Sequence, residues 1–366
     1  MTDGFLRVAA AVPRVQLADI SANTQEIEKL MVAAEGKDVE ILCFPELCIT
    51  GYTCQDLFAQ QLLLEEAEHA LLKILELSRN LHVTTLVGLP FYHRGMLLNC
   101  AAVVQNGKLH GLVPKTYIPN YKEFYERRWF TSSTDLHEAE TIRFCGQSVL
   151  LSTQQLFKHR DTTFGIEICE DLWAPIPPSN RAVLEGAEII FNLSASNDLV
   201  GKNDYVRNLV TGQSARCHCA YVYAGCGYGE STQDVVFGGK AFIAENGRLL
   251  AEAHPFSTES QLVFTEVDLD ILHSERQNNT SFGQCAGLFA QSQHYALKEL
   301  SQGQMKDGNF ELTRPIPALP FVPRPEEFDI RSNEILSIQT FGLARRIEHT
   351  HSKHVVIGVS GGLDST

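Results

Sequence analysis

The chain contains 366 residues, of which 44% are hydrophobic and 20% are charged, and this length allows one large domain and a second, smaller one. Its 30 basic and 44 acidic residues give a formal net charge of -14, which disfavours nucleic acids and anionic membranes as partners. The ten cysteines lack the spacing of a disulfide framework, no apolar stretch is long enough to cross a bilayer, and the N-terminus lacks a signal-peptide pattern. We therefore expect a cytoplasmic protein with reduced thiols.

The first 90 residues alternate between strand and helix patterns. Apolar runs predict strands at residues 5–13, 39–46 and 83–90. Periodic apolar residues predict helices at residues 23–38 and 58–80. Asn23, with Glu26 three residues later, has the pattern of a helix cap. This alternation is typical of layered α/β proteins.

Two asparagine-glycine pairs interrupt this alternation. Asn106-Gly107 and Asn246-Gly247 each stand between apolar runs, which is the commonest signal for a two-residue β-hairpin because both turn positions need positive φ. Hairpins combined with strand-helix units imply mixed sheets. The pattern therefore favours a sandwich of two sheets over one doubly wound sheet.

The regular pattern fades after residue 275. Five prolines follow in a short stretch and favour an extended connector: Pro315, Pro317, Pro320, Pro323 and Pro325. A helix pattern at 332–349 and an apolar run at 353–360 indicate the start of another domain. We therefore divide the chain into a first domain at 1–275, a linker at 276–328 and the beginning of a second domain at 329–366.

The stretch "TTFGIEICEDLWAP" presents a cysteine at the end of a predicted strand. Apolar residues alternate along it and deliver Cys169 to a sharp turn before Pro175. Three acidic residues surround this thiol, namely Glu167, Glu170 and Asp171, and a structural thiol does not require such polar neighbours. Backbone N-H groups at a turn, together with a nearby cation, would activate the sulfur and hold an oxyanion. Cys169 is thus a candidate nucleophile.

Two further strand ends carry a charged residue beside proline. In "ILCFPELCITGY" the apolar run delivers Glu46, and in "GLVPKTYIPNYKEFYE" the hairpin strand delivers Lys115. Each charge alone is more typical of an exposed strand end. With Cys169, however, they would provide a base, a cation and a nucleophile.

The phrases "FPELCITGY", "VPKTYIPNYKEFYE" and "GIEICEDLW" together resemble the nitrilase, or carbon-nitrogen hydrolase, superfamily, and most closely its glutaminase branch. The resemblance covers about three quarters of the chain. It implies a four-layer αββα sandwich in which Glu46 is the general base, Lys115 stabilises the oxyanion and Cys169 is the nucleophile. It also implies that Glu123, eight residues beyond Lys115, helps to position the base.

The same resemblance indicates the residues that bind L-glutamine. Tyr121, Ser196, Lys202, Tyr52 and Glu170 occupy corresponding places. A turn rich in serine and asparagine around Ser196 is also compatible with a simple loop cap. No cofactor or metal is expected for the glutaminase chemistry.

The segment "SGGLDST" at residues 360–366 resembles the pyrophosphate-binding loop of ATP pyrophosphatases, in a Rossmann-like domain of which 353–360 would be the first strand. Its candidate ATP-binding residues are Ser360, Gly361, Gly362, Asp364 and Ser365. A glycine pair also forms turns without a ligand. Following a nitrilase-like domain, the loop is similar to that of glutamine-dependent NAD synthetases. This resemblance implies ATP, Mg²⁺ and deamido-NAD as ligands of the complete protein, and a homo-oligomer.

Two alternatives remain at this point. One is a stand-alone nitrilase-type amidase that acts on another small amide, and the other is a non-catalytic nitrilase-like scaffold. The cluster of Cys217, His218 and Cys219 is too tightly spaced for a usual zinc site and lacks a second ligand pair, so we predict a buried strand there.

Overall fold

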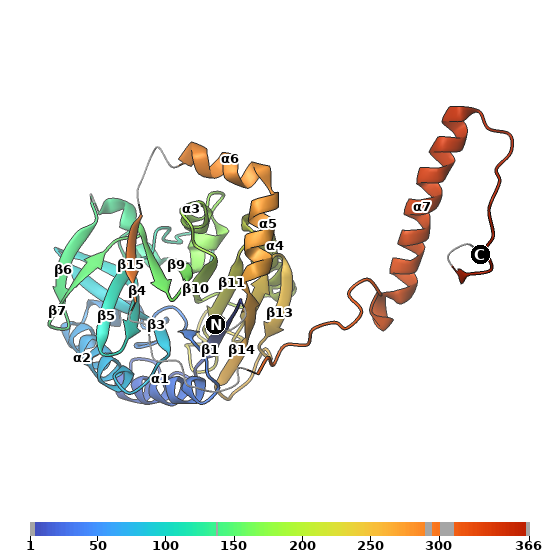
Figure 1. The fold of residues 1–366 in the computed structure, drawn as a ribbon. Helices are drawn as coiled ribbons and strands as arrows, with labels where there is room; N and C mark the ends of the chain where they lie inside the picture. The colour runs from blue at the N-terminus through green and yellow to red at the C-terminus, as the bar shows by residue number, and fades with distance from the viewer. Residues whose placement is uncertain (1–3, 137, 290–294, 301–310, 364–366) are drawn as a thin grey trace. The chain divides into compact units, whose positions relative to one another are not determined.

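The computed structural model describes residues 4–136, 138–289, 295–300 and 311–363 (Figure 1). The chain divides into two units, Met1–Arg314 and Pro315–Thr366, which are described separately below. Among the described residues, no helix is long and apolar enough to cross a membrane.

The first unit contains two mixed β-sheets. One sheet has the strand order β14 (Gln261–Asp268), β1 (Phe5–Val12), β2 (Ile41–Cys43), β3 (Thr84–His93), β4 (Met96–Gln105), β5 (Lys108–Pro114), β7 (Gln147–Leu151) and β6 (Glu140–Phe144). The other has the order β13 (Arg248–Glu252), β12 (Ala241–Glu245), β11 (Ala220–Gly225), β10 (Ile189–Ser194), β9 (Thr162–Ile168), β8 (Gln155–His159) and β15 (Ala296–Glu299). Strands β1, β2 and β3 are parallel, as are β9, β10 and β11.

Helices cover the outer face of each sheet. Helices α1 (Ile20–Glu35) and α2 (Gln61–Ser78) share a core with the first sheet, and α3 (Pro178–Leu184) and α4 (Lys202–Cys217) share one with the second. A third core lies between the two sheets, because alternate residues of each strand point inward, as Val8 and Ala10 do in β1. The predicted αββα sandwich is confirmed.

Several predicted local features are present, and one helix boundary differs. Both asparagine-glycine pairs form hairpin turns, with φ of 49° and 71° at Asn106 and Gly107. The strand predicted at Cys217, His218 and Cys219 begins later than expected, because Cys217 ends a helix at residues 202–217 and β11 begins at Ala220. The expected cap at Asn23 is wrong, because α1 begins three residues earlier and Asp19 accepts the capping hydrogen bond from the N-H of Ala22. Asn23 instead lies inside the helix and bonds the carbonyls of Gln16 and Ile49.

The first unit extends well past residue 275, where we expected a linker to begin. Helices α5 (Leu269–Asn278) and α6 (Thr280–Phe289) follow β14, and β15 pairs with β8. The end of the unit is anchored by Arg314, whose guanidinium contacts Glu245 at 2.8 Å, and by Thr313, whose hydroxyl contacts Glu266 at 2.9 Å.

The second unit contains η5 (Pro325–Glu327) and one long helix, α7 (Phe328–Thr350), which includes the helix predicted at 332–349. The predicted buried strand at 353–360 is wrong for this structure: these residues have no strand assignment and are exposed, with Val356 97% accessible. A buried strand requires neighbouring strands, and the described residues of this unit contain none.

Candidate active site

The three predicted catalytic residues lie at the carboxyl ends of strands from both sheets. Glu46 follows β2, Lys115 follows β5 and Cys169 follows β9. Strands β2 and β5 have the same direction, because β3 is parallel to β2 and two antiparallel pairings separate β3 from β5. Their ends therefore reach the same edge of the first sheet. There they meet the end of β9 across the sandwich.

Glu46 is completely buried and is held through one carboxylate oxygen. Its Oε1 accepts hydrogen bonds from Lys115 Nζ and from Asn99 Nδ2, both at 2.6 Å. Its Oε2 is buried without a hydrogen-bond partner among the described residues. Burial raises the pKa of Glu46 from 4.5 to about 7, although the charge of Lys115 opposes this rise. A buried carboxylate with one unoccupied oxygen and a pKa near neutrality is suited to general base catalysis.

Lys115 lies between two carboxylates. Besides Glu46, it contacts Glu126, whose Oε1 and Oε2 are 3.0 and 2.8 Å from Nζ. Burial alone would lower the pKa of Lys115, but the charges of Glu126 and Glu46 raise it well above its ordinary value. The lysine therefore remains a cation inside the protein.

The second glutamate of the site is Glu126, and the prediction that Glu123 fills this role is wrong. Glu126 is 2% exposed and also accepts a hydrogen bond of 2.6 Å from the hydroxyl of Tyr52. Glu123 instead accepts a hydrogen bond of 2.8 Å from Asn197 Nδ2. The segment after Lys115 is irregular, with φ of 50° at Lys122, so the side-chain direction cannot be read from residue spacing.

Cys169 stands at the turn between β9 and the short helix η4 (Cys169–Trp173). Its φ is 44°, a left-handed conformation that is uncommon for residues other than glycine. The Cys169 N-H donates to Asn192 Oδ1 at 3.1 Å, so the N-H of Glu170, at the start of η4, is the candidate backbone donor for an oxyanion.

The thiol of Cys169 is electrostatically coupled to the two other groups. Burial and the charge of Glu46 raise the pKa of Cys169, whereas the charge of Lys115 lowers it. The net effect is a thiol that is protonated at neutral pH, so its proton must move during nucleophilic attack. Cys169 is only 5% exposed and belongs to the apolar core between the sheets, while Glu46, Lys115 and the Ser194 hydroxyl lie close enough to interact with its thiol.

The other predicted residues occupy an outer layer around the thiol. The Tyr121 hydroxyl contacts the Glu170 carboxylate at 2.8 Å, and Tyr121 is 46% exposed. Lys202 Nζ lies 5.5 Å from the ring centres of both Phe124 and Trp173 and donates to Asn197. This half-buried cation and the Glu170 carboxylate therefore lie near the thiol with opposite charges.

Tyr52 and Ser196 are placed differently from the outer layer. Tyr52 points its hydroxyl at Glu126 and lines a small cavity of about 50 Å³ with Glu126 and Glu123. Ser196 is buried after β10, near the hydroxyl of Tyr223. The structure thus places Tyr52 against Glu126, the second glutamate of the site.

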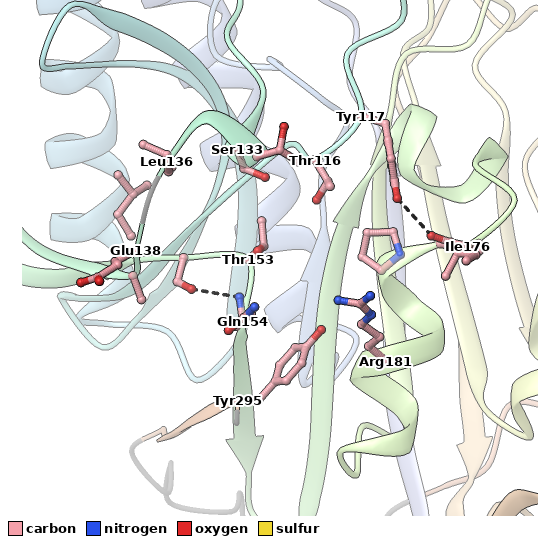
Figure 2. Close-up of a pocket in the computed structure, with 16 residues that line it drawn as sticks. Thr116, Tyr117, Ser133, Leu136, Glu138, Thr153, Gln154, Ile176, Arg181 and Tyr295 are labelled. Carbon is pink, nitrogen blue, oxygen red and sulfur yellow. Dashed lines mark hydrogen bonds between the residues drawn. The ribbon is translucent and has the colours of Figure 1, made fainter. Parts of the chain in front are cut away.

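A larger cavity of about 690 Å³ lies beside the site (Figure 2). Thr116 and Tyr117, which directly follow Lys115, form part of its wall, and the Tyr117 hydroxyl contacts the carbonyl of Ile176 at 3.4 Å. Arg181 and Tyr295 form the opposite part. Cys169 is not among the residues that line this cavity or the smaller one.

The candidate ATP-binding residues belong to the second unit. Ser360, Gly361 and Gly362 are exposed in an irregular segment, where Gly361 has φ of 86°. They form no anion-binding helix terminus in the described part of the chain, so we derive no step that involves ATP or Mg²⁺. Asp364 and Ser365 lie outside the described residues. Across the described ranges, no group of three or more His, Cys, Asp or Glu residues is arranged to hold a metal ion.

Asn99, Glu126, Asp171 and Asn192 complete the site, and the sequence interpretation assigned none of them a role. Asn99 and Asn192 are single polar residues inside apolar strands, which is a usable signal because buried amides require partners. Asp171 was recognised only as one of the acidic neighbours of Cys169. Glu126 has no local signal that separates it from Glu123.

Comparisons with known proteins show the family to which this chain belongs. Residues 7–277 match the family model described as carbon-nitrogen hydrolase. A curated protein of Mycobacterium tuberculosis named glutamine-dependent NAD(+) synthetase is 37% identical over 375 residues, which cover 99% of this chain and 54% of the relative. The chain therefore spans about half the length of the curated relatives it matches.

Two solved structures show the same fold. A glutamine-dependent NAD(+) synthetase from Cytophaga hutchinsonii is 30% identical, with a TM-score of 0.65, and the match covers 72% of this chain and 43% of that one. A carbon-nitrogen hydrolase from Helicobacter pylori is 18% identical, with a TM-score of 0.60, and the match covers 80% of this chain and 96% of that one.

Proposed function

Because this chain belongs to the carbon-nitrogen hydrolase family, we propose that its first unit hydrolyses the side-chain amide of L-glutamine to glutamate and ammonia. The observation that carries the proposal is the convergence of a buried base, a buried cation and a thiol at the ends of three strands. The unoccupied Oε2 of Glu46 is the acceptor that this chemistry requires.

The first half-reaction forms a thioester. Cys169 Sγ attacks the amide carbon while the thiol proton moves to Glu46 Oε2. Lys115 and the N-H of Glu170 stabilise the negative charge that develops on the amide oxygen. The C-N bond then breaks, and Glu46 returns the proton to the nitrogen, which leaves as ammonia.

The second half-reaction releases glutamate. Water attacks the thioester carbon and transfers a proton to Glu46, and the same donors stabilise the second oxyanion. The C-S bond breaks, and the proton returns to the sulfur. In both halves Glu126 keeps Lys115 charged and fixed beside the base.

Glutamine fits the outer layer better than a simple amide does. Its α-carboxylate needs a cation, which Lys202 provides, and its α-ammonium needs an anion, which Glu170 provides. The names of the relatives support the same substrate. A stand-alone amidase acting on an uncharged amide would have no use for this pair of opposite charges.

The wider role follows from those relatives. We infer that in the complete protein the ammonia enters an ATP-dependent amidation of deamido-NAD, for which residues 360–366 would bind the pyrophosphate. A cytoplasmic location and a homo-oligomeric assembly belong to the same inference.

Cys169→Ala tests the proposal. The variant should retain the wild-type melting temperature and lose at least about 10³-fold in glutamine hydrolysis, because no other group can form the thioester. Glutamine-dependent ammonia release in that variant would overturn the assignment. Hydrolysis of small uncharged amides by the wild type in preference to glutamine would favour the amidase alternative. Inactivity of the wild type on glutamine and on these amides would favour the non-catalytic scaffold.

A further inference from the structure

Asp171 is a buried carboxylate that the proposed chemistry does not use. It is 2% exposed, and its oxygens accept hydrogen bonds from three backbone N-H groups. Oδ2 accepts from Ile168 at 2.9 Å, and Oδ1 accepts from Thr116 at 3.1 Å and from Tyr117 at 2.8 Å. A single side chain therefore satisfies one buried and two partly buried backbone donors.

These donors belong to the two segments that carry the catalytic cation and the nucleophile. Ile168 is the residue before Cys169, at the end of β9 in one sheet. Thr116 and Tyr117 directly follow Lys115, at the end of β5 in the other sheet. Asp171 thus joins the two sheets at the point where Lys115 and Cys169 must meet.

Both segments depend on such external support. The left-handed φ of 44° at Cys169 is unfavourable by itself and persists only where neighbours fix it. Lys115 is held through its own backbone by Asn99 and Ser133, at 2.8 and 3.0 Å, but neither of these hydrogen bonds involves the nucleophile turn. Only Asp171 bonds both segments among the hydrogen bonds of the described residues.

The segment that follows Lys115 also borders the cavity of Figure 2. The side chains of Thr116 and Tyr117 line that cavity, whereas their N-H groups are bonded to Asp171. The cavity therefore provides space into which this segment can shift if its hydrogen bonds to Asp171 are lost.

We propose that Asp171 is a positioning residue that fixes the ammonium of Lys115 relative to the sulfur of Cys169. The proposal rests on the function proposed above, since it concerns the same reaction. Asp171 contacts no reacting atom in the proposed chemistry, and its effect passes through the backbone. A shift of about 1 Å between catalytic groups reduces rates by roughly 10²-fold.

Asp171→Asn in the full chain is the direct test. An amide has one acceptor oxygen, so its NH₂ group must face at least one backbone N-H, and one of the two segments is released. We expect kcat for glutamine to fall roughly 10- to 100-fold with KM changed less than about twofold, because Tyr121, Glu170 and Lys202 are untouched. Alkylation of Cys169 by iodoacetamide should slow, because Lys115 no longer lowers the pKa of the thiol as strongly.

Glu188→Gln is the matched control. Glu188 is 6% exposed and accepts a backbone hydrogen bond of 3.0 Å from Thr163, at the opposite end of β9. The Glu188→Gln variant should have a lower melting temperature than the wild type, with unchanged kcat and an unchanged rate of Cys169 alkylation. If Asp171→Asn behaves in the same way, Asp171 is merely structural and the proposal is wrong.

Other outcomes are equally decisive. If Asp171→Asn does not fold, Asp171→Glu keeps the carboxylate and lengthens the connection by one methylene, so kcat should again fall, and wild-type kcat overturns the proposal. Activity in Cys169→Ala contradicts the proposed function, whereas an inactive Cys169→Ala beside a fully active Asp171→Asn contradicts only the positioning role. If the wild type does not hydrolyse glutamine, the alkylation rate decides: an unchanged rate in Asp171→Asn overturns the proposal.

Discussion

The two units of the chain differ in which side chains they bury. The first unit encloses Glu46, Lys115 and Glu126, each at 2% exposure or less, although burying charge is costly. The second leaves apolar side chains accessible, with Ile338 68% and Phe341 82% exposed. A sequence motif becomes an organised site only where other elements cover it. The first unit provides that cover and the described part of the second does not.

The largest effect is expected from replacing the buried base, Glu46. This substitution tests whether the buried charge serves catalysis or stabilises the fold. Glu46→Gln cannot accept the thiol proton, so kcat should fall by roughly 10²- to 10⁴-fold. Burial raises the pKa of Glu46 from 4.5 in the unfolded chain to about 7 in the folded protein. The ionised carboxylate therefore lowers the free energy of unfolding, with its full effect above about pH 7 and almost none below pH 4.5. The variant should therefore melt at or above the wild-type temperature at pH 8, with a smaller advantage at pH 5. A clearly lower melting temperature at pH 8 would show that the charge stabilises the fold.

The pH dependence of wild-type glutamine hydrolysis tests whether the catalytic carboxylate is buried or exposed. Because the ionised form of Glu46 is the base, kcat/KM for glutamine should fall up to about tenfold per pH unit as the pH decreases below about 7. An exposed carboxylate would place this transition near pH 4.5. Steady-state rates between pH 5 and pH 9 check the prediction, and activity that stays level down to pH 5 contradicts it.

A glycine tests how closely the buried segment is packed. A Cβ at Gly88 in β3 would lie 2.3 Å from the N of Leu47 and 2.6 Å from the O of Pro45, on either side of Glu46. Gly88→Ala must displace this backbone, so we expect kcat to fall roughly 10- to 100-fold. Gly36→Ala is the control, because the φ of Gly36 is -68° and the nearest atom to an added Cβ, the carbonyl oxygen of Ala33, would lie 3.5 Å away. Equal kcat values for the two variants would show that the base tolerates movement.

A smaller effect is expected in the outer layer, where the site reaches solvent. Tyr121→Phe removes the hydroxyl that contacts Glu170, and KM for glutamine should rise about 3- to 10-fold with kcat nearly unchanged. Tyr92→Phe, at an even more exposed tyrosine of β3, should leave both constants unchanged. An unchanged KM in Tyr121→Phe would remove this residue from the glutamine site.

The smallest effect on activity is expected in the second unit, at helix α7. Helix α7 has no buried residue, and most of the stability of a protein helix comes from the packing of a buried face. Its amides should exchange hydrogen much faster than those of β1 and β3, as measured by mass spectrometry. Protection of α7 equal to that of the strands would contradict the contrast between the two units.

The sequence by itself determined the layered fold, both hairpins and the three strand-end groups Glu46, Lys115 and Cys169. Each is a local signal: an apolar run, a turn dipeptide, or a charge or thiol where an apolar run stops. Neighbouring residues along the chain are enough to produce such signals.

Only the tertiary structure decided which of two nearby glutamates faces Lys115, which backbone donors Asp171 accepts, and whether residues 353–360 form a strand. Glu126 rather than Glu123 meets Lys115, because the irregular backbone between them turns Glu126 inward, where Tyr52, 74 residues earlier in the chain, also donates to it. The apolar run at 353–360 remains irregular because a strand is completed by hydrogen bonds to other strands. These outcomes depend on partners far away in the sequence, which no local pattern specifies.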